Sequence, residues 1–363
     1  MKIIVASSGR AHLLDCAREL YNQGHDVLFY SFTYKRYMDI FDFPRERYKS
    51  LLWIVAPFLL LDRKFHVKWA RKTWRNLMDI YLSKTIPRCD VFIAQSPLFS
   101  HTLIRVKKKY NAITILDRGT SHVRKYNQIL KKYISSQQPE SYQKQDENQY
   151  KIVDYITIAS DFVRDGFIEF GVSENKIFVN PYGVLLNHFS PTKCTCEYDV
   201  IMVGQWSKRK GCHIVVNALK GTKYKLLHVG SLYMDFPNER NFFHQNSVQE
   251  IELINYYSKS KVFLFPSIED GFGLVLTQAV ACGLPIVCSK NCGGPTLKKM
   301  IKDRNRIFIM EEITEKELLR GIEYCINIDT GQVRNYQINM ELLSWNAYGK
   351  RYNDFLTQIK HNS

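Results

Sequence analysis

The chain has 363 residues, which is enough for two domains of ordinary size. Its composition, with 45% hydrophobic, 24% charged and 13% aromatic residues, excludes a disordered, collagen-like or low-complexity protein. Lysine and arginine outnumber aspartate and glutamate by 51 to 35, which gives a formal net charge of +16. We therefore expect an anionic partner, which could be a nucleic acid, a phosphate-bearing substrate or a membrane surface.

Short apolar runs alternate with helix-like stretches over the first half of the chain. Residues 3–6 form the first run, followed by the turn Ser7-Ser8-Gly9, an amphipathic stretch closed by a glycine, and a second run at 27–30. This succession is typical of a parallel β-α-β unit. Runs of the same kind recur at residues 91–94, 113–116 and 155–159. We therefore expect a doubly wound sheet over residues 1–190.

The same alternation restarts after a polar break at residues 190–193. Expected strands lie at residues 199–203, 224–229, 262–265 and 285–288, and expected helices at 212–219 and 277–281. Two α/β domains in series, 1–190 and 191–343, fit this pattern better than one large sheet. Ligands bind at the carboxyl ends of strands in open parallel sheets, so two such domains facing each other would form one cleft. The topology predicts a bilobed enzyme.

Residues 51–61 (LLWIVAPFLLL) form the most apolar stretch, and they are too few to span a bilayer, which needs about 20. Residues 63–75 hold six basic residues and no acidic one: Arg63, Lys64, Lys68, Arg71, Lys72 and Arg75. The stretch is either a buried helix or one lying in a membrane interface beside these cations, which could also be ordinary solvated helix faces. We expect a soluble or peripheral protein rather than an integral one.

The chain start and the cysteines suggest a cytoplasmic location. The apolar run after Lys2 is only four residues long, too short for the core of a signal peptide. The nine cysteines include one close pair, Cys194-x-Cys196, and no second pair at zinc-ribbon spacing. We expect free, mostly buried thiols in a reducing compartment.

The sharpest segment is FPSIEDGFGLVLTQAVACGLPIVCS at residues 265–289. Gly271 and Gly273 let backbone N–H groups at a helix start approach a diphosphate. Glu269 and Asp270 stand where they could accept hydrogen bonds from sugar hydroxyls, and Gln278 follows Asp270 by about two helical turns. The alternative is a packing turn whose glycines allow close strand–helix contact.

A second segment, VGQWSKRKG at residues 203–211, places three cations after a strand that ends in Gly204. Arginine can bind a phosphate with two parallel hydrogen bonds, and lysine supplies a point charge. Lys208, Arg209 and Lys210 therefore form a candidate phosphate-binding loop. A basic surface turn is the alternative.

Together these segments resemble the nucleotide-sugar motif of the retaining glycosyltransferases of family 4, which have the two-Rossmann GT-B fold. That motif carries two acidic residues around a G-F-G-L run, matched here by Gly271-Phe272-Gly273-Leu274. The resemblance implies that Asp270, with Glu269 adjacent, contacts the donor sugar and that Gln278 binds the ribose hydroxyls. It also implies that a final helix, 344–363, crosses back to the first domain.

The resemblance further assigns the donor diphosphate to Lys210. The family's arginine position holds Gln205 here, so Lys208 or Arg209 would supply the second cation, beside Gly204. Gly9 matches the N-terminal glycine loop near the diphosphate. In a weaker match, DRGTSH at 117–122, His122 would bind the sugar or leaving phosphate, and Asp117 or Arg118 would position the acceptor.

These observations predict a glycosyltransferase that uses a UDP- or GDP-sugar and a glycan acceptor, with a lipid-linked cell-envelope polysaccharide as the expected class. The chain contains no D-x-D triplet, so we expect no metal and no other cofactor. We expect a peripheral position on the cytoplasmic face of an anionic membrane and no nucleic-acid partner, because no nucleic-acid-binding signature is present. The alternative is a non-catalytic sugar- or nucleotide-binding protein with a decayed site, as Gln205 and Gln278 would suggest.

Overall fold

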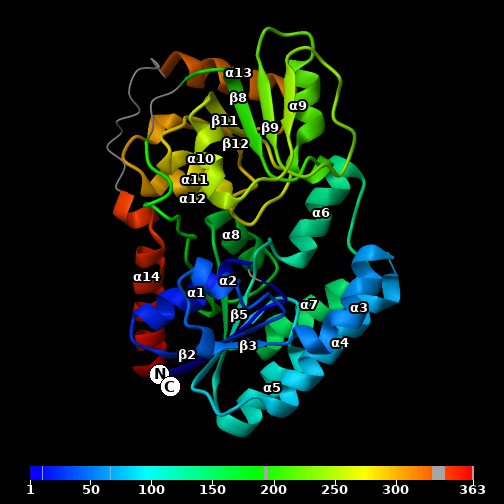
Figure 1. Ribbon diagram of the computed structural model, residues 1–363, viewed down its shortest axis with the longest axis vertical. Coiled ribbons are helices and arrows are strands. Elements are labelled where there is room, and N and C mark those ends of the chain that lie inside the picture. Colours follow the sequence, from blue (N-terminus) through cyan, green and yellow to red (C-terminus); the bar gives the residue numbers. More distant parts are fainter. Residues whose placement is uncertain (10, 66, 192–194, 329–339, 362–363) are drawn as a thin grey trace.

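The computed structural model describes residues 1–9, 11–65, 67–191, 195–328 and 340–361. These residues form two α/β domains, one above the other, each built on its own parallel sheet (Figure 1). The expectation of two Rossmann-like doubly wound domains is thereby confirmed.

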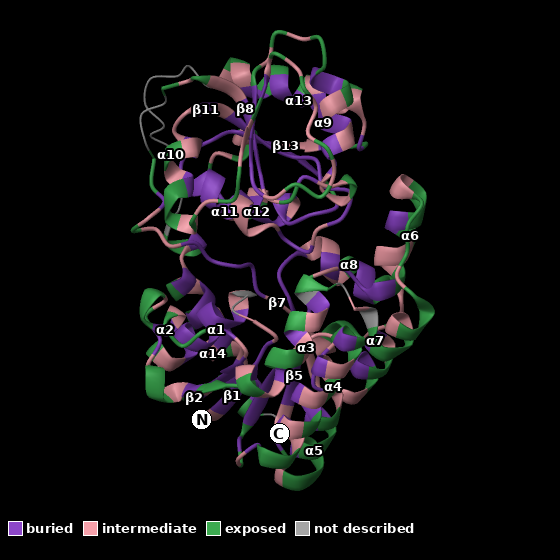
Figure 2. Ribbon diagram, turned by 45° about the vertical axis from the view of Figure 1, so that its right-hand side comes forward, coloured by how far each residue is buried: buried purple, intermediate pink, exposed green. Residues whose placement is uncertain are grey.

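The N-terminal domain has a seven-stranded sheet, within the described residues, in the order β3-β2-β1-β4-β5-β6-β7. Its strands are β1 (Lys2–Ala6), β2 (Asp26–Ser31), β3 (Tyr48–Ser50), β4 (Val91–Gln95), β5 (Ile113–Asp117), β6 (Tyr155–Ile158) and β7 (Ile177–Val179). Its helices are α1 (Ala11–Asn22), α2 (Tyr37–Ile40), α3 (Leu52–Lys64), α4 (Lys68–Thr85), α5 (Ser100–Tyr110), α6 (Val123–Ile134), α7 (Glu140–Ile152) and α8 (Asp161–Glu169). Residues 3–6 of β1 are fully buried, because helices cover both faces of the sheet (Figure 2).

The C-terminal domain has a six-stranded sheet, again counting described residues only, in the order β10-β9-β8-β11-β12-β13. Its strands are β8 (Tyr198–Val203), β9 (Leu226–Val229), β10 (Phe242–Gln245), β11 (Ser260–Phe265), β12 (Ile286–Ser289) and β13 (Ile307–Met310). Its helices are α9 (Cys212–Leu219), α10 (Leu253–Tyr257), α11 (Leu274–Ala281), α12 (Gly294–Met300) and α13 (Glu315–Ile328). Two short 3-10 turns matter below: η3 (Lys208–Lys210) and η4 (Glu250–Glu252).

The last helix, α14 (Trp345–His361), runs alongside α1 of the N-terminal domain (Figure 1). The Tyr352 hydroxyl lies 3.1 Å from Thr157 Oγ1. Arg351 donates from Nε to Asn180 Oδ1 and from Nη2 to the Pro181 carbonyl, both at 2.8 Å. The end of the chain is thus bound to the first domain and to the segment that joins the domains.

Residues 52–61 of this stretch fall in α3, which forms a helical hairpin with α4 at the edge of the N-terminal domain. The inner side chains, such as Val55 and Met78, are buried in the core. Trp53 and Trp69 are 67% and 59% exposed, so the hairpin is buried on one face only. No helix within the described residues is long and apolar enough to cross a membrane.

Most of the described cysteines are free and buried, as expected. They are Cys16, Cys89, Cys212, Cys282, Cys288, Cys292 and Cys325. Cys196 is instead disulfide-bonded, so the expectation of free thiols does not hold there. Cys194 lies outside the described residues.

Candidate active site

The two domains touch where the segment after β5 meets the segment after β11. Glu269 Oε1 accepts hydrogen bonds from the backbone N and the Oγ of Ser121, both at 3.0 Å. Ser160 Oγ donates to the Gly271 carbonyl at 2.6 Å. A Cβ on Gly271 would lie 2.6 Å from the carbonyl carbon of Gly119, so only glycine fits here without moving the backbone. The domains are therefore closed onto each other at this point.

The basic loop η3 is held against the same segment of the C-terminal domain. Gly211, which ends η3, has φ +80°, and a Cβ on it would lie 2.9 Å from the carbonyl carbon of Pro266. The Ile268 backbone N donates to the Arg209 carbonyl at 2.9 Å, and Arg209 Nη1 donates to the Glu269 carbonyl at 2.8 Å. These contacts fix the cations of η3 beside the acidic pair.

Lys210 and Arg209 form an ion-pair cluster with that acidic pair. Lys210 Nζ bonds the Asp270 carboxylate. Arg209 Nη1 lies 3.7 Å from Glu269 Oε2 and 3.9 Å from Asp270 Oδ2. The structure therefore brings together four of the residues that the sequence singled out.

Burial and neighbouring charges shift the pKa values of the two carboxyl groups in opposite directions. Burial raises the pKa of Glu269, against the opposing effects of its hydrogen bonds from Ser121 and the charge of Arg209. Burial also acts to raise the pKa of Asp270, but the charges of Lys210 and Arg209 outweigh it and bring that pKa below its ordinary value. Asp270 is thus the more firmly anionic of the pair.

The glycines after Asp270 shape the start of α11. Gly273 has φ +85° and is the N-cap residue of α11. The Phe272 backbone N donates to Asp270 Oδ1 at 3.2 Å, and the Phe272 ring lies edge-on to Tyr182 with centroids 5.4 Å apart. The helix N-terminus, with its partial positive charge, therefore lies next to the Lys210–Asp270 pair.

Three other residues expected at the donor site in the C-terminal domain lie in the loop after β8 and take no part in the ion pairs described above. Gly204 has φ +125° directly after β8, a conformation that favours glycine. Gln205 and Lys208 are exposed in the loop that follows. Their side chains are available to a ligand.

Gln278 is oriented toward η4 and α10. Its Nε2 donates to Glu250 Oε1 at 3.0 Å, and its Oε1 accepts from the Tyr257 hydroxyl at 3.1 Å. The side chain is almost fully buried. Both ends of the amide therefore already have protein partners.

The turn after β1 is held by one side chain of β4. Gln95 Oε1 accepts from the Ser8 backbone N at 2.8 Å, from Ser7 Oγ at 3.0 Å and from Ser8 Oγ at 2.9 Å. A Cβ on Gly9 would meet no atom within 4 Å, so this turn has open space beside it. Arg10 lies outside the described residues.

The structure does not bring His122 to the ion-pair cluster. Its Nδ1 accepts from the Arg124 backbone N at 3.3 Å, and its ring stacks on Phe170 with centroids 4.9 Å apart. Burial lowers the pKa of His122 to about 4. It lines a separate cavity of about 310 Å³ with Lys151 and Lys176. A capping and packing role explains these contacts.

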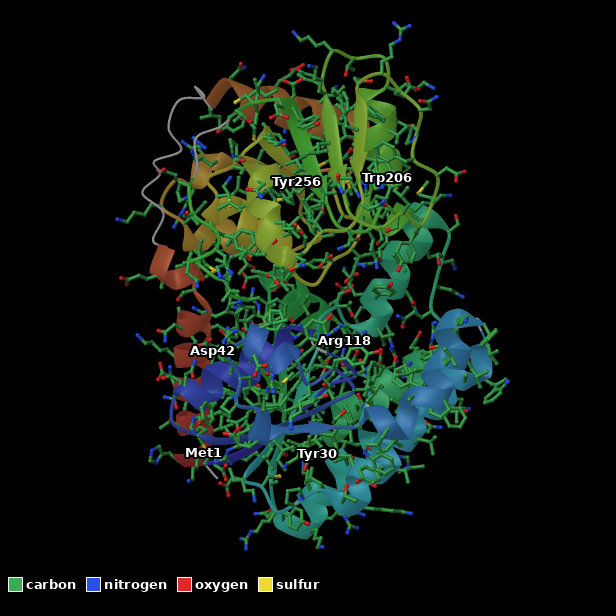
Figure 3. All side chains as sticks on the ribbon, viewed as in Figure 1. Met1, Tyr30, Asp42, Arg118, Trp206 and Tyr256 are labelled. Carbon is green, nitrogen blue, oxygen red and sulfur yellow. The ribbon has the colours of Figure 1, made fainter. Side chains whose placement is uncertain are left out.

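Asp117 and Arg118 both have partners inside the N-terminal domain. Arg118, labelled near the domain boundary in Figure 3, pairs with buried Asp146 at 2.9 Å. Asp117 Oδ1 lies 2.6 Å from His12 Nε2, which is also 3.0 Å from the Tyr182 hydroxyl. His12 was not singled out from the sequence. The available signal was a polar residue in the first turn of the helix after β1.

Part of the chain is similar in sequence to known glycosyl transferases. Residues 187–339 match the family model described as "Glycosyl transferases group 1". An uncharacterized glycosyltransferase of Haemophilus influenzae is 35% identical over 72 residues, or 20% of each chain. The capsular polysaccharide biosynthesis glycosyltransferase CapM of Staphylococcus aureus is 25% identical over 213 residues, or 53% of each chain. The chain thus spans about half, or less, of the curated relatives it matches.

The whole chain is similar in fold to solved glycosyltransferase-type structures. HepE of Anabaena, solved in complex with UDP and glucose, superimposes with a TM-score of 0.71 at 14% identity and covers 99% of this chain and 100% of its own. Sucrose-phosphate synthase of Thermosynechococcus elongatus gives a TM-score of 0.67 at 15% identity, with full coverage of both chains. The chain therefore has the two-domain GT-B fold, and its C-terminal half is similar in sequence to the group 1 glycosyl transferases.

Proposed function

We propose that the protein is a retaining glycosyltransferase of the family 4 type that moves a sugar from a UDP- or GDP-sugar to a hydroxyl of a glycan acceptor. One observation carries this proposal: Lys210 and Arg209 are fixed beside Asp270 at the start of α11, where the two domains close. Two cations and a helix N-terminus form a site suited to a diphosphate.

In the proposed reaction the donor diphosphate takes the place of Asp270 as the partner of Lys210. Lys210, Arg209 and the start of α11 stabilise the negative charge that develops as the bond from sugar carbon to phosphate oxygen breaks. The acceptor hydroxyl forms the new bond on the same face of the sugar, and its proton passes to the departing phosphate. Asp270, released from Lys210, accepts hydrogen bonds from the sugar hydroxyls. We propose that these side chains act without a metal ion.

The nature of the relatives supports the donor and acceptor classes. HepE was solved with UDP and glucose, and CapM is named for capsular polysaccharide biosynthesis. We accordingly propose a nucleoside-diphosphate sugar as donor and a cell-envelope polysaccharide intermediate as acceptor.

The α3–α4 hairpin supports a peripheral position on a membrane. Trp53, Leu60, Phe65 and Trp69 are exposed on it beside the cations Lys64 and Lys72. Exposed aromatic side chains next to cations suit the headgroup region of an anionic bilayer. The side chains of Arg63 and Lys68, two members of the basic cluster, lie outside what is described. We propose that this hairpin holds the enzyme on the cytoplasmic face, near a lipid-linked acceptor.

Thermal-shift binding of UDP, GDP, ADP and their common sugars tests the donor site. We expect a nucleotide-dependent rise in Tm that Lys210→Ala abolishes and Lys220→Ala preserves, because Lys220 is an exposed partner of Glu239 on the protein surface. No shift with any nucleotide would refute the donor site. Binding without turnover of any sugar nucleotide would favour the non-catalytic alternative.

A further inference from the structure

A cavity of about 840 Å³ lies between the domains, separate from the ion-pair cluster. One wall belongs to α2 of the N-terminal domain, with Arg36 and Tyr37, and the opposite wall to residues 248–251, between β10 and α10. Leu185 and His188, on the segment joining the domains, close one side. In Figure 3 the label Tyr256 marks α10, which follows this wall. Apolar and aromatic walls with a few polar groups are typical of a small-molecule site.

Glu250 is the carboxylate of this cavity, and a chain of hydrogen bonds fixes its position. Gln278 Nε2 donates to Glu250 Oε1, and the Tyr257 hydroxyl donates to Gln278 Oε1. Tyr257 is fully buried and Gln278 nearly so, which leaves the amide no freedom to turn toward a ligand. Gln278 therefore fixes where this carboxylate lies in the wall of the cavity.

The cavity is also at a suitable distance from the proposed phosphate site. Gln278 lies four residues after Leu274, the first residue of α11, which corresponds to about 6 Å along a helix. One helix thus places its N-terminus by Lys210 and its next turn by Glu250. A ligand with a diphosphate at one end and a hydroxyl-bearing ring at the other would reach both.

We propose that Glu250, rather than Gln278, binds the ribose hydroxyls of the donor nucleotide, with the nucleoside lying in the cavity between α2 and residues 248–251. A carboxylate that accepts hydrogen bonds from ribose hydroxyls is a recurring feature of nucleotide sites in parallel α/β sheets. Gln278 is then a positioning residue, which acts by holding Glu250. This inference rests on the proposed function, because it assumes a nucleotide donor.

The test compares ribonucleotides with 2′,3′-dideoxynucleotides. Dissociation constants of UDP, GDP and their 2′,3′-dideoxy forms are measured by calorimetry for the wild type, Glu250→Gln and Glu252→Gln. Glu252 lies in the same turn, and its carboxylate accepts from the Gln249 backbone N at 2.8 Å, a contact that glutamine can also make. Glu252→Gln is therefore the matched control.

We expect the wild type and Glu252→Gln to bind the ribonucleotide at least about tenfold more tightly than the dideoxy form, since hydrogen bonds to a charged group are strong. Glu250→Gln should lose most of this preference while binding the dideoxy form as the wild type does. Gln278→Leu, which removes the amide that positions Glu250, should lose part of it.

Two results would overturn the inference and leave the proposed function standing: equal affinity of the wild type for both forms, or a full ribose preference in Glu250→Gln. Failure of the wild type to bind any nucleotide would instead refute the proposed function, and the inference with it.

Discussion

Replacing Gly271 by alanine tests whether the observed contact between the domains is the catalytically competent one. A Cβ at this position would lie 2.6 Å from the carbonyl carbon of Gly119, compared with at least 3.4 Å for an ordinary contact. The two segments must therefore separate by about 1 Å, and a misplacement of that size can cost a catalytic site about a hundredfold in rate. The two hydrogen bonds from Ser121 to Glu269, both 3.0 Å long, would also lengthen beyond useful range.

Turnover of the sugar nucleotide and nucleotide binding should respond differently to Gly271→Ala. We expect kcat to fall by about a hundredfold. The affinity for the nucleotide should change much less, because Lys210 and Arg209 lie in the same domain as α11. Gly119→Ala is the matched control, since a Cβ there would meet its nearest neighbours at 3.9 Å. Wild-type kcat in Gly271→Ala would refute the role of this contact.

Three further predictions follow from the geometry. Burial raises the pKa of Glu269, so the protonated carboxyl stabilises the fold at low pH and this contribution is lost as the pH rises. The Tm of Glu269→Gln, measured relative to that of the wild type, should therefore increase from about pH 4 to 7. A Tm difference that stays constant with pH would contradict this. Burial lowers the pKa of His122 to about 4, so the folded protein binds this proton less readily than the unfolded chain. The free energy of unfolding of the wild type should therefore fall by about 2 to 3 kcal/mol between pH 7 and 4.5. His122→Asn, whose side chain can still accept from Arg124 N, should lose this pH dependence in urea titrations and keep its kcat. A tenfold loss of kcat would instead place His122 at the sugar. Replacing Trp53 and Trp69 by serine should reduce sedimentation with anionic vesicles severalfold without changing nucleotide binding; unchanged sedimentation would exclude the α3–α4 hairpin as the docking surface.

The bounds of helices and strands were predicted well where a clear sequence signal, such as a glycine, marks the end of the element. Residues 212–219 form α9 as expected, because Gly211 stops the preceding turn and the apolar residues that follow have helical spacing. The helix expected at 277–281 instead begins at Leu274, since Gly273 with φ +85° serves as its N-cap. The strand expected at 224–229 begins two residues later, at Leu226.

The candidate site was predictable only where each of its residues stands in a short sequence motif. Lys210 and Asp270 stand in two short motifs whose strands, β8 and β11, are adjacent in the sheet. The pairing of His12 with Asp117 joins residues 105 positions apart, which no local pattern can indicate. Which face His122 turns toward depends on aromatic packing from α7 and α8, and the partner of Gln278 depends on the path of the chain after β10.

The central claim is that the loop of Lys210 and the start of α11 form the site of sugar transfer. Proton NMR of the wild type with α-linked UDP- and GDP-sugars, followed over time, tests it most directly by recording both release of the nucleoside diphosphate and the configuration of the new product. We expect one sugar nucleotide to be consumed with the α configuration retained, and Lys210→Ala to be at least about a hundredfold slower, as is typical when a group that stabilises the developing charge is lost. A β-configured product would contradict retention. Equal rates in the wild type and Lys210→Ala would contradict the placement of the site.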